Sequence, residues 1–188
     1  MNDLLNKNKY PKGTALLIID AQDKIISPIL NKEKIIKNIS KFLNAYKVLG
    51  GTNIYISEQN PTKLGPTTSS LVKDNQLTRL VKMDFSIIND KLFINELESQ
   101  KISTLIVCGF ETHICVQQSV LDLIKINTEV YILADAMGSR NSVDHHIGIK
   151  RMMSKGAIIA SVESMIFELC QTSSRKEFKY IRDLIKNN

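Results

Sequence analysis

Thr14-Ala-Leu-Leu-Ile-Ile-Asp20 is the stretch that decides the fold class, because an acidic residue follows directly on an unbroken run of apolar and β-branched residues. A run that is apolar at every position, rather than at every second one, is typical of a strand buried on both faces. Such strands belong to parallel sheets that helices cover on both sides. The stretch therefore predicts a parallel sheet whose first strand ends at Asp20, at the edge where this architecture binds ligands.

Outward from this strand, apolar runs and helical periodicity alternate along the whole chain. The expected further strands are 53–57, 79–82, 104–109, 129–134 and 157–161, and the expected helices are 32–50, 89–100, 113–125, 143–155, 162–170 and 175–186. This alternation predicts an α/β fold, a single-domain three-layer α/β/α sandwich with a six-stranded, mainly parallel Rossmann-like sheet. The domain is expected to span 1–188, with an N-terminal extension over 1–12 and a C-terminal helix over 174–188. The segment 60–73, rich in Pro and Thr, is expected to be a loop that forms a lid or pocket wall.

Composition narrows the class of protein. The 188 residues are 43% hydrophobic and 23% charged, values typical of a soluble globular domain. No apolar run is long enough to cross a bilayer and no secretory signal is recognisable, so we expect a cytoplasmic protein with no membrane partner. The net charge is +6, but the lysines are spread thinly and the chain has no Trp. No nucleic-acid partner is therefore expected, since basic and aromatic residues do not alternate as in base-stacking surfaces.

Metal-binding and reactive residue types are scarce. The three cysteines are Cys108, Cys115 and Cys170, and the three histidines are His113, His145 and His146. An odd number of cysteines without an export signal predicts reduced thiols, and no pair has the spacing of a structural zinc site. We expect His145 and His146 to be structural or solvent-facing. Neither a G-x-G-x-x-G motif nor a P-loop is present, so the residues predict no nucleotide cofactor.

Three reactive residues follow strands at the predicted ligand-binding edge: Asp20, Lys82 and Cys115. Each has an ordinary alternative, since Asp20 can cap a turn, Lys82 can be a solvated strand end and a cysteine can be a small buried hydrophobe. Thr112 is a candidate N-cap that places Cys115 in the first turn of a helix. There the helix dipole and a nearby lysine are expected to lower the thiol pKa. Cys108, inside an apolar strand, is interpreted as a core residue.

Several segments resemble the isochorismatase-like cysteine hydrolase superfamily. They are LLIIDAQ at 16–22, RLVKMDFS at 79–86, CGFETHICVQQSV at 108–120, LADAMGSR at 133–140 and GAIIASVESMIFEL at 156–169. The stretch SEQNPTKLGPT at 57–67 is most similar to a metal-independent branch of uncharacterised hydrolases. It has no histidine of the kind that nicotinamidases pair with an acid to hold a divalent metal. The resemblance therefore implies neither a metal nor a cofactor.

The resemblance also implies a mechanism. Cys115 would be the nucleophile, Asp20 the general acid and base, and Lys82 the electrostatic support. A cis peptide would join Phe110 to Glu111, and the backbone N–H groups of Glu111 and Cys115 would form an oxyanion hole. The implied activity is hydrolysis of a small amide or carbamoyl compound through a thioester, in a homo-oligomer. Two alternatives stay open, namely hydrolysis of an isochorismatase-type vinyl ether and an oligomeric binding scaffold with an idle triad.

Position along the chain indicates which residues could line a substrate pocket. Side chains near the ends of the predicted strands are the candidates, although packing and turn formation explain the same positions equally well. The candidates are Gln22, Ile25, Gln59, Phe85, Phe110 and Ile114. Arg140, in the sequence Gly-Ser-Arg, is expected to be a structural or subunit-interface residue.

Overall fold

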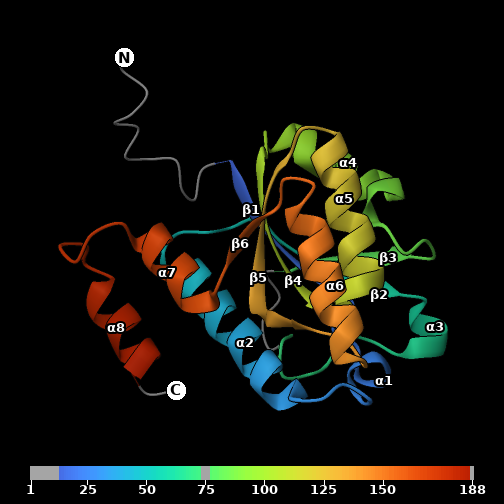
Figure 1. The fold of residues 1–188 in the computed structure, drawn as a ribbon. Helices are drawn as coiled ribbons and strands as arrows, with labels where there is room; N and C mark the ends of the chain where they lie inside the picture. The colour runs from blue at the N-terminus through green and yellow to red at the C-terminus, as the bar shows by residue number, and fades with distance from the viewer. Residues whose placement is uncertain (1–12, 73–76, 187–188) are drawn as a thin grey trace.

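The computed structural model describes residues 13–72 and 77–186, so the expected N-terminal extension over 1–12 and Lys73 of the expected loop lie outside the described residues (Figure 1). Six strands form one parallel sheet in the order β3-β2-β1-β4-β5-β6. They are β1 (Thr14–Ile19), β2 (Ile54–Gln59), β3 (Thr78–Lys82), β4 (Thr104–Phe110), β5 (Glu129–Gly138) and β6 (Ile158–Ala160). The predicted fold class is confirmed, and the strand order reverses beside β1, between β2 and β4.

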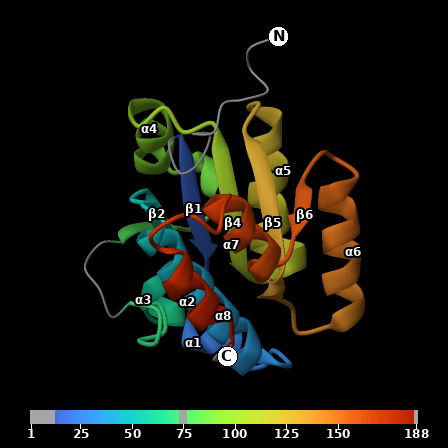
Figure 2. The ribbon, with the colours of Figure 1, turned by 90° about the vertical axis from the view of Figure 1, so that its left-hand side faces the viewer.

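Helices cover both faces of the sheet and complete three layers (Figures 1 and 2). On one face lie α2 (Lys32–Val48), α7 (Val162–Cys170) and α8 (Phe178–Lys186), and on the other lie α4 (Lys91–Ser99), α5 (Gln117–Lys125) and α6 (Ser142–Met153). Two short helices, α1 (Asp23–Ile26) and α3 (Pro61–Leu64), lie beyond the carboxyl ends of the strands. Among the described residues, no helix is both long and apolar enough to span a membrane.

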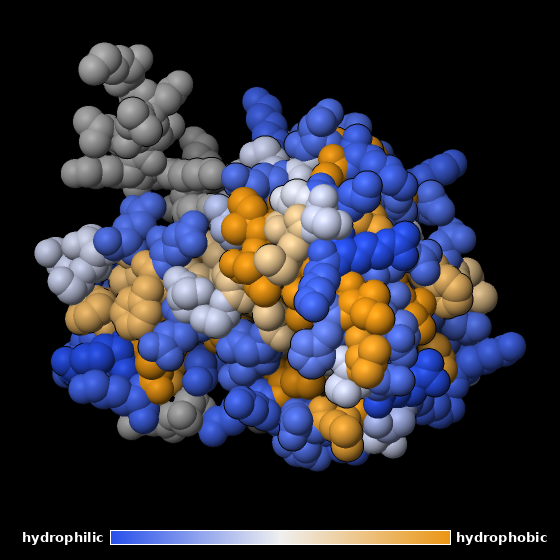
Figure 3. Space-filling model, in the orientation of Figure 1, coloured by the Kyte–Doolittle hydropathy of each residue, from blue (hydrophilic) through white to orange (hydrophobic). Residues whose placement is uncertain are grey.

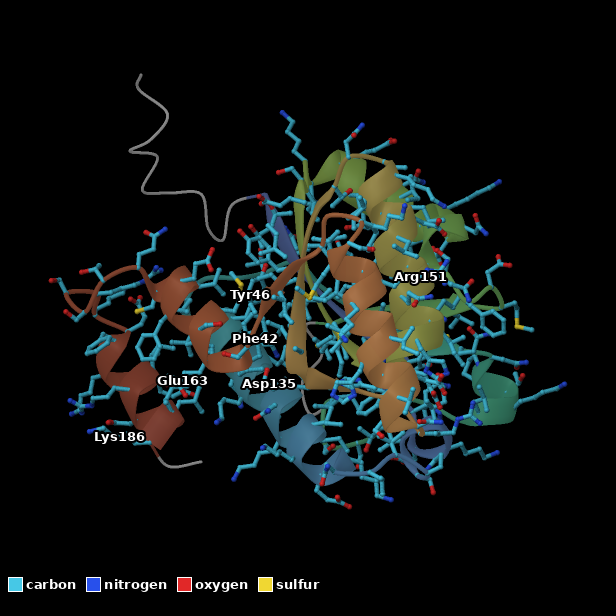
Figure 4. The ribbon with its side chains drawn as sticks, viewed as in Figure 1. Phe42, Tyr46, Asp135, Arg151, Glu163 and Lys186 are labelled. Carbon is cyan, nitrogen blue, oxygen red and sulfur yellow. The ribbon has the colours of Figure 1, made fainter. Side chains whose placement is uncertain are left out.

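Alternate residues of β1 supply the two halves of the core. Leu16 and Ile18 pack with the α2 side, whereas Leu17 and Ile19 pack with the α5 side. On α2, Phe42 and Tyr46 lie one turn apart and stack against each other with ring centroids 6.1 Å apart (Figure 4). The Tyr46 hydroxyl donates to the Thr14 carbonyl oxygen over 2.8 Å. Each of these buried aromatic side chains contributes about 1.5–3 kcal/mol to folding, which fixes α2 against the start of β1.

Several predicted elements have different ends or contents in the structure. β5 continues to Gly138 because a register shift between Val107 and Gly109 lets it pair again with the end of β4. The predicted loop over 60–73 contains α3, which begins with a proline at its first turn, and an isolated bridge between Gln22 and Thr67. Proline is well suited to that position, because its missing N–H would have no partner inside the helix. The last helix, α8, begins at Phe178 instead of 175.

Gly109 brings the two central strands into close contact beside the ligand-binding edge. Its φ is +123°, and a Cβ at this position would lie 2.1 Å from the carbonyl oxygen of Ile19. Only glycine fits such an approach and such a conformation. Asp20, which follows Ile19 at the end of β1, has a φ of +50°. This left-handed conformation breaks the alternation of side chains along β1.

Candidate active site

A buried ion pair stands at the carboxyl ends of the central strands. The Lys82 ammonium, at the end of β3, lies 2.7 Å from Oδ2 of Asp20, which follows β1, and both side chains are almost inaccessible to solvent. The other carboxylate oxygen, Oδ1, accepts a 2.6 Å hydrogen bond from the Ser57 hydroxyl on β2. Buried charges persist only when they are paired and hydrogen-bonded. The parallel sheet thus brings together two residues that are 62 positions apart in the sequence.

Gln59 fixes the ammonium from its other side. Its Oε1 accepts a 2.7 Å hydrogen bond from Lys82, while its Nε2 donates to the Met83 carbonyl oxygen over the same distance. Because the amide group has one acceptor and one donor end, the bond to Met83 orients the oxygen towards Lys82. Gln59 therefore positions the Lys82 ammonium of the ion pair, and it also lines the cavity described below.

Gln22 was expected to line a pocket, and this prediction is wrong. Its side chain is fully buried, donates to the carbonyl oxygens of Gln59 and Gly65, and accepts from the Gln59 N–H. Two of these bonds satisfy the backbone N–H and carbonyl groups of Gln59 at the end of β2, and the third satisfies the Gly65 carbonyl oxygen after α3. Gln22 consequently joins the segment after β1 to the segment around α3, and leaves none of its amide group for a ligand.

Cys115 lies in a π-helical turn, η3 (Thr112–Val116), and not in the first turn of an ordinary α-helix. The Val116 N–H donates to the Glu111 carbonyl oxygen over 3.3 Å, the wider spacing of a π-helix, and Glu111 takes the N-cap position. The prediction that Thr112 is the cap is wrong. Thr112 is buried beneath α6, where its hydroxyl hydrogen-bonds Nδ1 of His145 over 2.9 Å.

The Cys115 thiol is within hydrogen-bonding reach of both Asp20 and Lys82. Burial and the Asp20 carboxylate raise the pKa of this thiol to about 12, and the Lys82 ammonium opposes them. The prediction of a lowered pKa is therefore wrong, because desolvation of a thiolate outweighs the lysine. The thiol thus lies beside one group that favours its protonated form, the Asp20 carboxylate, and one that favours the thiolate, the Lys82 ammonium.

The peptide between Phe110 and Glu111 is cis, and Glu111 stands directly before η3. The Cys115 N–H belongs to the first turn of that helix. N–H groups in the first turn of a helix have no carbonyl acceptor within the helix. The oxyanion hole from these two N–H groups stays a prediction.

A cavity of about 260 Å³ opens above Cys115. Four of the six expected pocket residues line it, namely Ile25, Gln59, Phe85 and Ile114. Phe110 does not, because it is fully buried in the core near Gly138. The remaining lining residues are Lys24, Pro28, Leu64, Glu111 and Arg140.

Arg140 was expected to have a structural or interface role, yet it lines the same cavity as Cys115. Its Nε lies 2.6 Å from Oε1 of Glu111. Arg140 follows the carboxyl end of β5, so the rule that selected Asp20 and Lys82 could have selected it as well. Lys24 and Leu64 lie on α1 and α3, whose positions over the site were not predictable from periodicity.

Within the part of the chain that the structure describes, no three His, Cys, Asp or Glu side chains are grouped as metal ligands would be. After β2, the Glu58 carboxylate accepts hydrogen bonds from the N–H and hydroxyl of Thr67. The independence from metal stays a prediction.

Comparison with known proteins places this chain in a family. The model of the isochorismatase domain matches residues 14–164. The chain belongs to the isochorismatase family. Isochorismatase family protein 1B of Dictyostelium discoideum is 34% identical over 94% of this chain and 87% of its own length. The structure of a MAR1 ribonuclease from Caenorhabditis elegans is similar with a TM-score of 0.87, at 30% identity, over 94% of this chain and 91% of that one.

A second solved structure shares the fold. The YcaC gene product of Escherichia coli, described as an octameric hydrolase of unknown specificity, matches with a TM-score of 0.81 at 20% identity, over 94% of each chain. Proteins with this fold thus carry names that imply different activities.

Proposed function

We propose that this isochorismatase-family chain is a cysteine hydrolase that cleaves the C–N bond of a small amide or carbamoyl compound, without a metal or cofactor. The observation that carries the proposal is the Cys115 thiol beside the buried Asp20–Lys82 ion pair, on the wall of a cavity of about 260 Å³. A nucleophile, a base within reach and a third group that orients the base are the parts of covalent acyl transfer. The cavity is at the small end of ligand sites, which favours a small substrate.

In the first step, the proton of Cys115 passes to Asp20 and the sulfur adds to the carbonyl carbon. The transfer leaves the total charge of the thiol, carboxylate and ammonium unchanged, so Lys82 stabilises the thiolate once Asp20 is neutral. The negative oxygen that develops is held by the N–H groups of Glu111 and Cys115. Removing one such donor typically costs about 3 kcal/mol of transition-state stabilisation.

In the second step, Asp20 gives its proton to the leaving nitrogen, the C–N bond breaks and the thioester remains on Cys115. A water molecule then loses a proton to Asp20 and attacks the thioester. The C–S bond breaks, the acid product leaves, and the proton on Asp20 returns to the sulfur. One carboxylate therefore acts as base, acid and base again.

Release of ammonia or an amine from a panel of small primary amides and N-carbamoyl compounds tests this proposal. We expect Cys115→Ala and the nearly isosteric Cys115→Ser to abolish turnover of any amide that the wild type hydrolyses, while Cys108→Ala keeps it. Turnover by the serine variant at the wild-type rate would contradict the covalent mechanism.

Two other activities belong in the same screen. The family name favours a vinyl-ether substrate, for which Cys115 need not be a nucleophile, so Cys115→Ala would keep activity. The similar Caenorhabditis elegans structure is named a ribonuclease, which favours including RNA in the screen. Cleavage of RNA by the wild type with no amide turnover would replace the proposal.

We also infer that the chain forms a homo-oligomer. Apolar side chains are exposed on α6 and on the edge strand β6, namely Val143, Ile147, Ile158 and Ile159 (Figure 3). An edge strand with apolar side chains is a surface that proteins commonly cover. The octameric relative supports the same inference, and a sedimentation measurement that finds only monomer would contradict it. Oligomerisation without turnover of any compound would favour the scaffold alternative.

A further inference from the structure

Helix α6 packs against the turn that carries Cys115. It lies along α5, the helix that continues from η3, and it contacts η3 itself (Figure 1). Gly148 of α6 makes this approach possible, because a Cβ at its position would lie 3.1 Å from the Cα of His113 in η3. In a close-packed interior, a side chain there would push the two elements apart. The position of Cys115 is therefore fixed from the helix layer as well as from the sheet.

A buried hydrogen bond joins the same two elements. The hydroxyl of Thr112, the first residue of η3, lies 2.9 Å from Nδ1 of His145, and Thr112 is fully buried. Within 13–72 and 77–186, this imidazole nitrogen is the one hydrogen-bond partner of the hydroxyl. A buried hydroxyl proton without an acceptor is costly, so the hydroxyl donates and Nδ1 accepts. The bond therefore requires an imidazole without a proton on Nδ1, which is a neutral imidazole.

The groups around His145 favour this neutral form. Burial lowers the pKa of His145, and the neighbouring His146 and His113 lower it further. The rings of His145 and His146 have centroids 5.4 Å apart. Both line a cavity of about 280 Å³, where Lys34 of α2 adds a positive charge and Asp135 of β5 a negative one. All three histidines of the chain thus gather at one contact, and burial and two more imidazoles oppose the protonation of His145.

We propose that His145 is a positioning residue for Cys115. As a neutral acceptor it anchors Thr112, which stands in the same five-residue turn as Cys115. This anchor keeps the thiol within reach of Asp20 and Lys82. His145 lies outside the set of residues that line the Cys115 cavity, so it acts through Thr112. This inference rests on the proposed function, because it concerns the same nucleophile.

Alkylation of Cys115 by iodoacetamide, followed by peptide mass mapping, tests the inference without a known substrate. The sulfur displaces iodide, so an S–C bond forms, the C–I bond breaks and the thiol proton passes to Asp20. We expect His145→Leu and Thr112→Val each to slow this reaction at about pH 8 by about five- to tenfold, since each removes the same hydrogen bond. The double variant should be no slower than the slower of the two, because the bond can be lost only once.

Two asparagine variants separate the hydrogen bond from other effects of a substitution. In His145→Asn the amide oxygen can take the place of Nδ1, so the acceptor is kept and the rate at the same pH should stay at the wild-type value. His146→Asn is the matched control, because Nδ1 of His146 hydrogen-bonds the Ser142 carbonyl oxygen of its own helix instead of η3. It should also leave this rate unchanged. Melting temperatures show which variants are folded, and Thr112→Val serves if His145→Leu is not.

The pH profile supplies a readout that a merely structural role would not move. Protonation of Nδ1 removes the acceptor, whereas His145→Asn has no group to protonate at this position. The ratio of the wild-type rate to the His145→Asn rate should therefore fall by about fivefold or more as the pH drops below about 6. In His146→Asn the fall should begin at a higher pH, because His146 no longer lowers the pKa of His145.

The outcomes separate this inference from the proposed function. Wild-type rates in both His145→Leu and Thr112→Val, or a rate ratio that does not change with pH, would overturn the positioning role even if amides are hydrolysed. Reactivity of Cys115 that depends on His145 in a chain without amide turnover would support the positioning role and contradict the hydrolase. A Cys115 that iodoacetamide does not alkylate would overturn both.

Discussion

Cys108 and Cys115 are two buried thiols seven residues apart, and they differ in what lies beside them. Both are free, and burial is the largest cause that raises the pKa of each. Cys108 sits inside β4 among core residues, and the Asp135 carboxylate raises the pKa of its thiol further. Cys115 has a carboxylate and an ammonium within hydrogen-bonding reach. Burial alone makes a thiol inert, whereas burial beside a base and a cation gives it a route to a stabilised thiolate.

Among the changes that test this difference between Cys115 and Cys108, removal of the Asp20 carboxylate should have the largest effect. We expect Asp20→Asn to lower kcat by about 10²–10⁴, the usual contribution of a general acid–base group. It also leaves the Lys82 ammonium buried without its partner, which costs about 3–5 kcal/mol of stability. Asp135→Asn is the matched control, since the Asp135 carboxylate raises the pKa of the Cys108 thiol. Unchanged turnover in Asp20→Asn, assayed below its melting temperature, would remove Asp20 from the mechanism.

The pH dependence of iodoacetamide alkylation tests whether Asp20 takes the proton of Cys115. If the Cys115 proton passes to Asp20, the number of bound protons does not change, so the iodoacetamide rate should be flat between about pH 6 and about pH 9. In Asp20→Asn, the thiol must lose its proton to solvent. Burial still raises the pKa of the thiol in this variant, while the loss of the Asp20 carboxylate and the remaining Lys82 ammonium lower it relative to the wild type. The rate should therefore rise with pH, by up to about tenfold per pH unit below the thiol pKa, instead of staying flat.

Glutathione is the reference for this profile, because its rate levels off above the ordinary thiol pKa of about 8.5. A wild-type Cys115 that follows the glutathione curve would show that neither burial nor Asp20 governs its proton.

At the other thiol, the expected effect is on stability alone. Cys108→Ala removes a buried side chain from the core and should cost about 1–2 kcal/mol in a denaturant titration, at unchanged kcat. A Cys108→Ala variant that loses turnover at wild-type stability would mean that the two thiols are not separable in function.

Metal removal should change nothing. Dialysis against a strong chelator is expected to leave both kcat and the melting temperature of the wild type as they were. Loss of activity that added zinc restores would support a metal-dependent reaction of the nicotinamidase kind.

The sequence predicted the sheet and the meeting of Asp20, Lys82 and Cys115 because strand patterns and the ends of parallel strands follow simple rules. It did not predict the π-helical turn of η3, in which Thr112 hydrogen-bonds His145 of α6. The thiol pKa was predicted in the wrong direction, since the depth of burial of Cys115 is a tertiary property. Arg140 was placed outside the site for a similar reason, because its contact with Glu111 joins two different strand ends.

The most direct test of the central claim is the reaction of the protein with p-nitrophenyl acetate, followed by stopped-flow absorbance and by mass spectrometry of the intact chain. We predict a burst of p-nitrophenol close to one equivalent per chain, and one acetyl group that peptide mapping places on Cys115. Cys115→Ala should show neither, and Cys108→Ala should show both. An acetyl group on another residue, or a wild-type burst that persists in Cys115→Ala, would contradict the claim that Cys115 is the nucleophile.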